Sequence, residues 1–205
     1  MTREELRNQD AEKIKEYINA HNGIAKTSEL YTLGMDFRRI QTFVKNGLLT
    51  KVRSGYYVLA DDKNDDAVIL SVFGDDGVLT MSSALYALGY LKKKPDEYHI
   101  AIDKNTSKSR FNIEYPFIKP YYTSPEFLYA GAKYVSFGGG EMRCYGPERT
   151  ICDCLKYEDK IDRETLKEAI RGYINDPEKD TFELLETAKE RKVLSKVRSM
   201  LGVWL

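Results

Sequence analysis

The first sixty residues follow a helical spacing of apolar positions and then change to an alternating one. Ile14, Tyr17, Ile18 and His21 recur at positions i, i+3, i+4 and i+7. One face of a helix has this spacing, so the pattern predicts an amphipathic helix over residues 10–21.

Two shorter helices are predicted next, with a tight turn between them. Thr27 is suited to cap a helix over residues 27–33, and Gly34 can end that helix in the left-handed conformation. Asp36 is suited to cap a second helix over residues 36–46.

The helix predicted over residues 36–46 has two faces of different chemistry. Its apolar arc consists of Phe37, Ile40, Phe43 and Val44. The opposite arc carries Arg38, Arg39, Thr42, Lys45 and Asn46. One face can pack against a core while the other offers donors to phosphates and base edges, as a helix in the major groove of DNA requires.

A short basic hairpin is predicted directly after this helix. Residues 49–52 and 56–59 alternate in polarity around the turn 53–55, and the strand period of two places Lys51 and Arg53 on one face. From Asp36 to Arg53 there are five Lys or Arg and one Asp, and 5 − 1 gives +4. We therefore expect residues 1–60 to form a winged helix-turn-helix that binds DNA phosphates. The alternative is a helical pair that only packs, with a solvated basic face.

The polar, acidic stretch 61–66 is the expected linker to a second domain over residues 67–205. Its beginning reads as a helix over 67–73 and another capped by Ser82 or Ser83. Strands are expected at 98–102, 111–115, 117–122, 134–137 and 142–145. Four helices are expected from Pro147 onward, each with an apolar face. The four faces consist of Ile151 and Leu155; of Leu166, Ala169, Ile170 and Tyr173; of Phe182, Leu185 and Ala188; and of Val197, Met200, Leu201 and Trp204. Ser195 is suited to cap the last helix. The fold class is thus α+β: a winged helix-turn-helix, then a mixed α/β domain with a tyrosine-rich sheet and C-terminal helices.

Aromatic side chains are dense in the predicted sheet. They are Tyr115, Phe117, Tyr121, Tyr122, Phe127, Tyr129, Tyr134, Phe137 and Tyr145, and the nearby loop adds Lys104, Lys108 and Arg110. Such a set can be a stacking platform for single-stranded nucleic acid, although aromatics also simply fill sheets. Tyrosines also suit a protein-binding surface.

Signatures of catalysis, metals and cofactors are sparse. The chain has two histidines, His21 and His99, so a histidine base or metal cluster is not expected, and we expect neither a cofactor nor catalytic residues. The odd number of cysteines, namely Cys144, Cys152 and Cys154, fits neutral core positions in a reducing compartment. The glycines 138–140 precede a strand, so they predict a hairpin turn rather than a phosphate-binding loop.

Arg149 and Asp153 are four residues apart on the helix expected after Pro147. This spacing predicts an ion pair on one helical face, where it would orient the helix against the sheet.

Charge and targeting signals restrict the function further. Lys and Arg minus Asp and Glu gives 10 − 7 = +3 for residues 1–60, 11 − 13 = −2 for residues 61–150, and 11 − 12 = −1 for residues 151–205. Any DNA binding is therefore expected of the N-terminal domain alone. Without an apolar run of membrane-spanning length or an apolar N-terminal signal, we expect a cytoplasmic protein that does not enter membranes.

Two segments together resemble a known family. The hairpin Lys51-Val52-Arg53-Ser54-Gly55-Tyr56-Tyr57 and the helix start Pro147-Glu148-Arg149-Thr150 with Asp153 are similar to AbiEi-type regulators, the antitoxins of type IV toxin–antitoxin and abortive-infection systems. The resemblance implies that the first domain represses its own operon by binding inverted repeats upstream of it, as a possible dimer. It also implies that the second domain counteracts a nucleotidyltransferase-like toxin, directly or indirectly.

The residues expected to carry these functions fall into two groups. DNA contacts are expected from Arg38, Arg39, Thr42, Lys45, Asn46, Lys51 and Arg53, and an antitoxin surface from Lys104, Lys108, Arg110 and Arg149. The alternative function is a nucleic-acid-processing enzyme docked by its winged helix. That enzyme would gather several acidic or histidine side chains in one cleft of residues 67–205.

Overall fold

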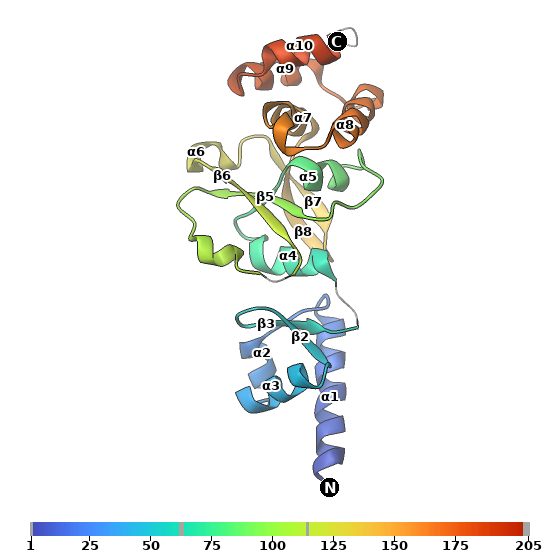
Figure 1. The fold of residues 1–205 in the computed structure, drawn as a ribbon, viewed down its shortest axis with the longest axis vertical. Helices are drawn as coiled ribbons and strands as arrows, with labels where there is room; N and C mark the ends of the chain where they lie inside the picture. Colours follow the sequence, from blue (N-terminus) through green and yellow to red (C-terminus); the bar gives the residue numbers. More distant parts are fainter. Residues whose placement is uncertain (1, 62–63, 114, 203–205) are drawn as a thin grey trace. The chain divides into compact units, whose positions relative to one another are not determined.

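The computed structural model describes residues 2–61, 64–113 and 115–202, without the side chain of Arg3. Trp204 and residues 62–63 of the expected linker lie outside this description. The chain forms two compact units (Figure 1): residues 1–73 with 108–116 and 136–141, and residues 74–107 with 117–135 and 142–205. The fold is α+β with two separate sheets, and none of the described helices is long and apolar enough to cross a membrane.

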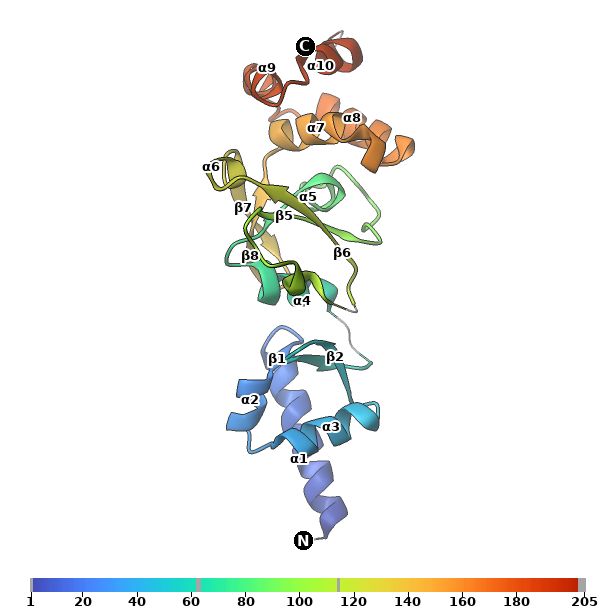
Figure 2. The same cartoon turned by 60° about the vertical axis from the view of Figure 1, so that its left-hand side comes forward.

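Three helices and a three-stranded antiparallel sheet form the N-terminal part of the first unit (Figure 2). The elements are α1 (Arg3–Ala20), β1 (Ala25–Lys26), α2 (Thr27–Thr32), α3 (Phe37–Lys45), β2 (Leu49–Arg53) and β3 (Tyr56–Leu59), and the strand order is β1-β3-β2. All three helices contribute to one buried cluster, through residues such as Ile18, Leu30 and Ile40.

Two helix starts differ from the sequence prediction because of side-chain caps. Helix α1 begins at Arg3 rather than at residue 10, because the Thr2 hydroxyl accepts from the Glu5 amide at 3.2 Å and the Glu5 carboxylate accepts from the Thr2 amide at 2.7 Å. Thr27 is the first residue of α2 rather than its cap, and the Glu29 carboxylate accepts from the Lys26 amide at 2.7 Å.

The predicted boundaries and most of the buried face of α3 are confirmed. The Asp36 carboxylate accepts from the Arg39 amide at 2.8 Å, Gly34 has φ +84°, and Ile40 and Phe43 are buried. Phe37 was expected on this buried face, but it is 58% exposed, because the core-facing side of α3 begins one turn later at Ile40.

A five-stranded mixed sheet forms the centre of the second unit. Helix α4 (Asp65–Phe73) and η1 (Lys108–Phe111) belong to the first unit. The sheet region consists of β4 (Val78–Leu79), α5 (Met81–Ala87), β5 (Tyr98–Asp103), β6 (Ile118–Thr123), α6 (Pro125–Leu128), β7 (Ala132–Phe137) and β8 (Gly140–Tyr145). The strand order is β6-β5-β4-β8-β7, with β5 parallel to β6, β4 antiparallel to β5, and β4 parallel to β8. Gly138 and Gly139 have positive φ in the predicted β7–β8 turn.

Three predictions in this region are wrong in detail. Helix α4 already includes Asp65 and Asp66 of the expected linker, because the Asn64 side chain accepts from the Ala67 amide at 3.1 Å. Thr80, not Ser82 or Ser83, is the N-cap residue of α5. No strand forms over the described part of 111–115: Phe111 ends η1 and stacks on Phe73, with ring centroids 5.4 Å apart.

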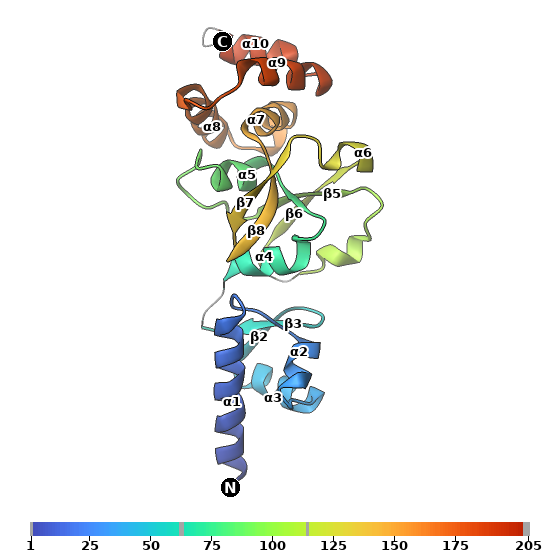
Figure 3. The same cartoon turned by 180° about the vertical axis from the view of Figure 1, so that it is seen from behind.

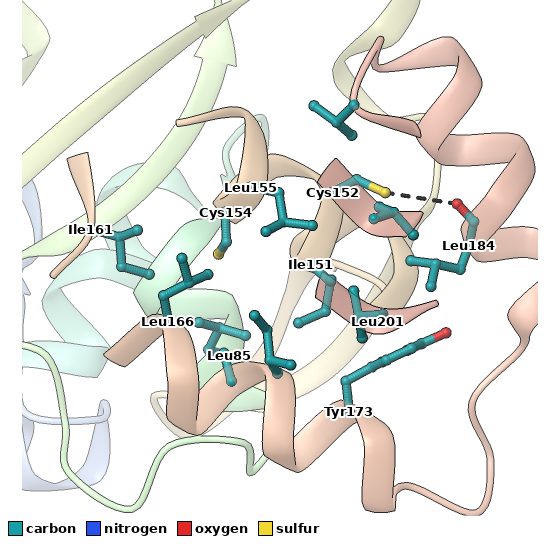
Figure 4. Close-up of a cluster of buried hydrophobic side chains, with 14 of the residues drawn as sticks. Leu85, Ile151, Cys152, Cys154, Leu155, Ile161, Leu166, Tyr173, Leu184 and Leu201 are labelled. Carbon is teal, nitrogen blue, oxygen red and sulfur yellow. Dashed lines mark hydrogen bonds between the residues drawn. The ribbon is translucent and has the colours of Figure 1, made fainter. Parts of the chain in front are cut away.

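The C-terminal helices lie together on the same side of the sheet as α5 (Figure 3). They are α7 (Pro147–Lys156), η2 (Glu158–Lys160), α8 (Arg163–Asn175), α9 (Thr181–Glu190) and α10 (Leu194–Leu201). Their apolar faces form the cluster in Figure 4, where the Cys152 thiol lies 3.8 Å from the Leu184 carbonyl oxygen. Two details differ from prediction: Phe182 is 74% exposed while Leu184 and Ala188 are buried, and α10 begins at Leu194, before Ser195.

All three cysteines are buried free thiols. Burial raises the pKa of Cys144 and Cys152 to about 12, so both are protonated at neutral pH. This agrees with the core positions expected for them.

Candidate nucleic-acid interface

The residues expected to contact DNA lie on α3, the residue after it, and β2. Arg38, Arg39, Thr42, Lys45 and Asn46 are exposed on or directly after α3, Lys51 is exposed on β2, and Arg53 is half-buried at its end. The buried Ile40 and Phe43 hold the opposite side of α3 against the core. The helix thus presents its polar side chains to solvent.

Arg39 differs from the other cations because it is already paired. Its Nη1 lies 3.2 Å from Asp10 Oδ2, and the Asp10 carboxyl is nearly buried on α1. The same nitrogen donates to the Gly34 carbonyl oxygen at 3.4 Å. In this structure Arg39 therefore joins α3 to α1.

The remaining polar residues of α3 have fewer contacts within the protein than Arg39 has. Arg38 and Lys45 form no ion pair among the described residues, whereas the Thr42 hydroxyl donates to the Arg38 carbonyl oxygen at 2.8 Å. Thr42 thus keeps its oxygen lone pairs and its methyl group for a partner. The two cations are free to meet phosphates or base edges.

The hairpin holds its cations around an aromatic ring. The Arg53 guanidinium lies 5.1 Å and the Lys26 ammonium 5.9 Å from the centroid of the Tyr56 ring. A register shift between Lys51 and Arg53 interrupts the alternation on which their expected common face rested. Lys26 was not predicted as part of this surface, because only the pairing of β1 with β3 brings it there.

A hollow of about 350 Å³ borders the first turns of α3. One of its lining residues is a second cation, after Lys26, that was not predicted from the sequence to lie at this surface. Arg7 of α1 lines it together with Arg38, Arg39 and Thr42. The pattern of residues 10–21 starts the helix too late to include Arg7. The capping-box spacing of Thr2 and Glu5 is the sequence signal that would have extended the helix.

The residues expected to form the antitoxin surface divide between the two units. Lys104 belongs to the second unit and lies 3.3 Å from the Ser124 hydroxyl, while Lys108 and Arg110 belong to the first. Arg110 donates to the Val72 carbonyl oxygen at 2.5 Å and lies over the Phe73 ring. Arg110 is therefore packed into its unit rather than projecting from it.

Arg149 is also buried, so it is no surface residue. Its Nε donates to Asp153 Oδ2 at 3.1 Å, as the spacing predicts, and its Nη1 donates to the Ala130 carbonyl oxygen at 2.7 Å. Asp153 Oδ1 accepts from Arg191 Nε at 2.7 Å. Arg191 follows α9, and no local pattern in the sequence indicates this second partner.

The predicted aromatic set divides between core and surface. Tyr145 is buried and donates to the Leu128 carbonyl oxygen at 2.9 Å, and Phe137 is buried as well. Tyr129 and Tyr134 are 46% and 58% exposed, and the Arg143 guanidinium lies 4.8 Å and 5.0 Å from their ring centroids. The Tyr129–Arg143–Tyr134 cluster is one exposed part of the set, and Phe117, Tyr122 and Phe127 are exposed as well.

One hollow of about 510 Å³ does collect acidic side chains around a histidine. His99, Glu97, Asp96, Asp162, Glu164 and Glu168 line it, together with Lys93, Lys94 and Lys160. Burial lowers the pKa of His99, whose Nε2 lies 3.1 Å from Glu97 Oε1, while its buried Nδ1 has no partner among the described residues. Glu97 is also paired with Lys119 at 3.1 Å, and no group of His, Cys, Asp or Glu in the described chain has the arrangement to hold a metal ion.

Comparisons with known proteins bear on the fold. No protein-family model matches the chain, and no curated protein matches it. Among solved structures, the chain is similar to the crystal structure of the RV2827C protein from Mycobacterium tuberculosis, with a TM-score of 0.55 and 12% sequence identity over 95% of this chain and 81% of that one. At this identity the likeness concerns the fold alone.

Proposed function

We propose that residues 2–60 form a winged helix-turn-helix and that the protein is a transcriptional autorepressor and antitoxin of the AbiEi type. The observation that carries the proposal is the two-sided α3. Ile40 and Phe43 are buried on one side, while Arg38, Thr42 and Lys45 are exposed on the other, next to a basic hairpin.

In this proposal α3 enters the major groove of the operator. Arg38 reads a base edge, with Thr42, Lys45 and Asn46 beside it, and Arg39 joins it once its pair with Asp10 opens. Lys51 and Arg53 contact the flanking phosphates from the hairpin, and Lys26 and Arg7 add to the same positive field. Two copies on an inverted repeat would place one α3 in each half-site.

The second unit is assigned the antitoxin role in a cytoplasmic protein. The charge balance supports this division, since the excess of cations lies in residues 1–60 (10 − 7 = +3). The Tyr129–Arg143–Tyr134 cluster is the contact surface we propose for the cognate nucleotidyltransferase-like toxin. Exposed tyrosines beside an arginine suit such a role because they offer contact area at a low entropy cost.

The proposal is tested by separating repression from protection in the full chain. The assay uses a bacterial strain in which the region upstream of the operon drives a reporter gene. The same strain carries an inducible copy of the nucleotidyltransferase-like reading frame expected beside this gene. Arg38→Ala with Arg39→Ala should abolish repression and still protect cells, whereas Tyr129→Ala with Tyr134→Ala should repress and fail to protect. Failure of the wild-type chain to protect against that toxin would overturn the antitoxin assignment.

The hollow around His99 favours one alternative, a nucleic-acid-processing enzyme with its chemistry in the second unit. A neutral imidazole that lines a hollow can act as a general base. Incubating the chain with labelled single- and double-stranded DNA and RNA, alongside His99→Gln, decides this point. Turnover that disappears with His99→Gln would replace the antitoxin proposal.

A further inference from the structure

A small polar pocket of about 180 Å³ lies within the second unit and shares Lys160 with the hollow around His99. Residues 120–123 and Ala101 line it from the sheet, and Asp153, Lys160 and Arg191 line it from the helical side. Pockets that enclose whole drug-sized ligands are roughly 300–1,000 Å³, so this one suits a single small group.

The charges around this pocket leave a positive balance. Both oxygens of the buried Asp153 are occupied, one by Arg149 and the other by Arg191. Of the charged residues that line the pocket, Arg191 and Lys160 are cations and Asp153 is an anion, so the lining sums to 2 − 1 = +1. Arg149 pairs with Asp153 from outside the lining, and Lys160 forms no ion pair among the described residues. The carboxylates of Glu97 and Asp159 also act on Tyr121. Arg191 Nε and Nη2 both contact Asp153 Oδ1, which leaves its Nη1 donors available.

The pocket also holds a hydroxyl without a partner. The Tyr121 oxygen is buried and forms no hydrogen bond among the described residues. Burial raises the pKa of Tyr121, so the group is a protonated O–H donor at neutral pH. A buried donor without an acceptor is costly, so an acceptor beside this hydroxyl would remove that cost.

The Lys160 ammonium is close to the same hydroxyl-bearing ring. Its Nζ lies 5.8 Å from the centroid of the Tyr121 ring and 4.9 Å from that of Tyr157. Three kinds of donor therefore line one small space: a tyrosine hydroxyl, an ammonium and a guanidinium. The carboxylate among them is already neutralised on both of its oxygens.

We propose that this pocket binds a phosphate group, either as free inorganic phosphate or as the terminal group of a small phosphate monoester. A phosphate anion suits the positive balance of this lining, and its oxygens are acceptors for Tyr121, Lys160 and Arg191. This inference is independent of DNA binding and gives the second unit a ligand of its own.

The test is isothermal titration of the full chain in a chloride buffer, with inorganic phosphate in one arm and adenosine 5′-monophosphate in the other. One-to-one binding is expected in at least one arm, and the tighter arm identifies the source of the group. Lys160→Ala and Tyr121→Phe should each weaken binding at least about tenfold. Lys189→Ala, which removes an exposed lysine of α9 paired with Glu186, is the control and should leave binding unchanged.

A thermal melt adds a readout that a merely structural role would not give. Tyr121→Phe keeps the ring and removes the hydroxyl that has no hydrogen-bond partner. Without phosphate, this variant should therefore have a higher melting temperature than wild type, and adding phosphate should no longer raise its melting temperature. Absence of binding in both arms up to on the order of 10 mM would overturn the proposal. So would binding that survives Lys160→Ala and Tyr121→Phe, because the anion would then lie elsewhere.

Discussion

Asp10 of α1 and Arg39 of α3 form an ion pair, with Oδ2 and Nη1 3.2 Å apart, across the face assigned to DNA. The carboxyl side chain is 9% exposed and the guanidinium side chain 43%. An ion pair this open to solvent contributes at most about 1 kcal/mol to stability. Its larger consequence is that it withholds one cation from DNA.

Asp10→Asn should therefore increase affinity for DNA of any sequence, most clearly at low salt, because it frees the Arg39 charge. The melting temperature should fall only slightly. Fluorescence anisotropy with a random-sequence duplex measures the affinity, and Glu12→Gln, which removes an exposed carboxylate of the same helix, is the control. Weaker binding by Asp10→Asn would instead mean that the pair holds Arg39 in its binding orientation.

Lys51→Ala should weaken binding to all sequences alike. The slope of log K against log salt is negative, and one lost phosphate contact reduces its magnitude by about 0.9. Titrations at several salt concentrations measure this slope, with Lys15→Ala on α1 as a lysine paired with Glu12 for comparison. A change confined to the operator sequence would show that Lys51 reads bases rather than phosphates.

Arg149→Ala should destabilise the second unit rather than remove a contact surface. The ion pair is buried, with side-chain exposures of 8% and 4%. Because Arg191 still pairs with Asp153, removal of Arg149 should cost less than the roughly 3–5 kcal/mol of a buried charge left unpaired. Urea denaturation measures the loss. Arg143→Ala, at an arginine that lies over exposed tyrosines, is the control and should be much milder. Equal stability of Arg149→Ala and wild type would contradict the orienting role of this pair.

Stability should decrease as the pH falls below about 6.5, the ordinary pKa of histidine. Burial lowers the pKa of His99 in the folded protein, against the opposing effect of Glu97. The unfolded chain therefore binds the proton first and gains population as the pH falls. His99→Gln should flatten this dependence below about pH 6.5. Matching slopes for wild type and His99→Gln would exclude His99 as the cause.

The domain boundary expected from the sequence leads to a fragment experiment. Residues 1–60 alone should retain affinity for operator DNA, and residues 67–205 alone should fold without it. The compact unit that contains residues 1–60 also includes α4 and segments 108–116 and 136–141. Circular dichroism and gel shift of both fragments test the boundary, and insolubility of both would show that the two parts share a core.

At α3, local signals in the sequence predicted most of the local structure. The Asp36 cap and the burial of Ile40 and Phe43 depend on neighbours within one or two turns, and the structure has all three. Phe37 follows the same helical period but is exposed. The period tells which face of α3 is apolar, but it does not tell how many turns of that face the core covers.

Long-range features escaped the sequence for a physical reason. The contact of Arg191 with Asp153 joins residues 38 positions apart, and that of Arg39 with Asp10 joins residues 29 apart. No periodicity links such residues, since only the packing of α7 with the end of α9, or of α3 with α1, brings them together. The sequence pattern therefore predicts the charged side chains of the candidate interface, whereas the residues that pair with them are known only from the folded structure.

The central claim is that α3 binds the operator. Gel shift of the full chain against the native upstream region, with wild type beside Arg38→Ala/Arg39→Ala, tests it most directly. Each base-reading arginine contributes roughly 1–3 kcal/mol, so the double variant should lose at least about tenfold in affinity for the operator and more than it loses for random DNA. Operator affinity equal to wild type in a folded double variant would contradict the assignment of α3 as the DNA-reading element.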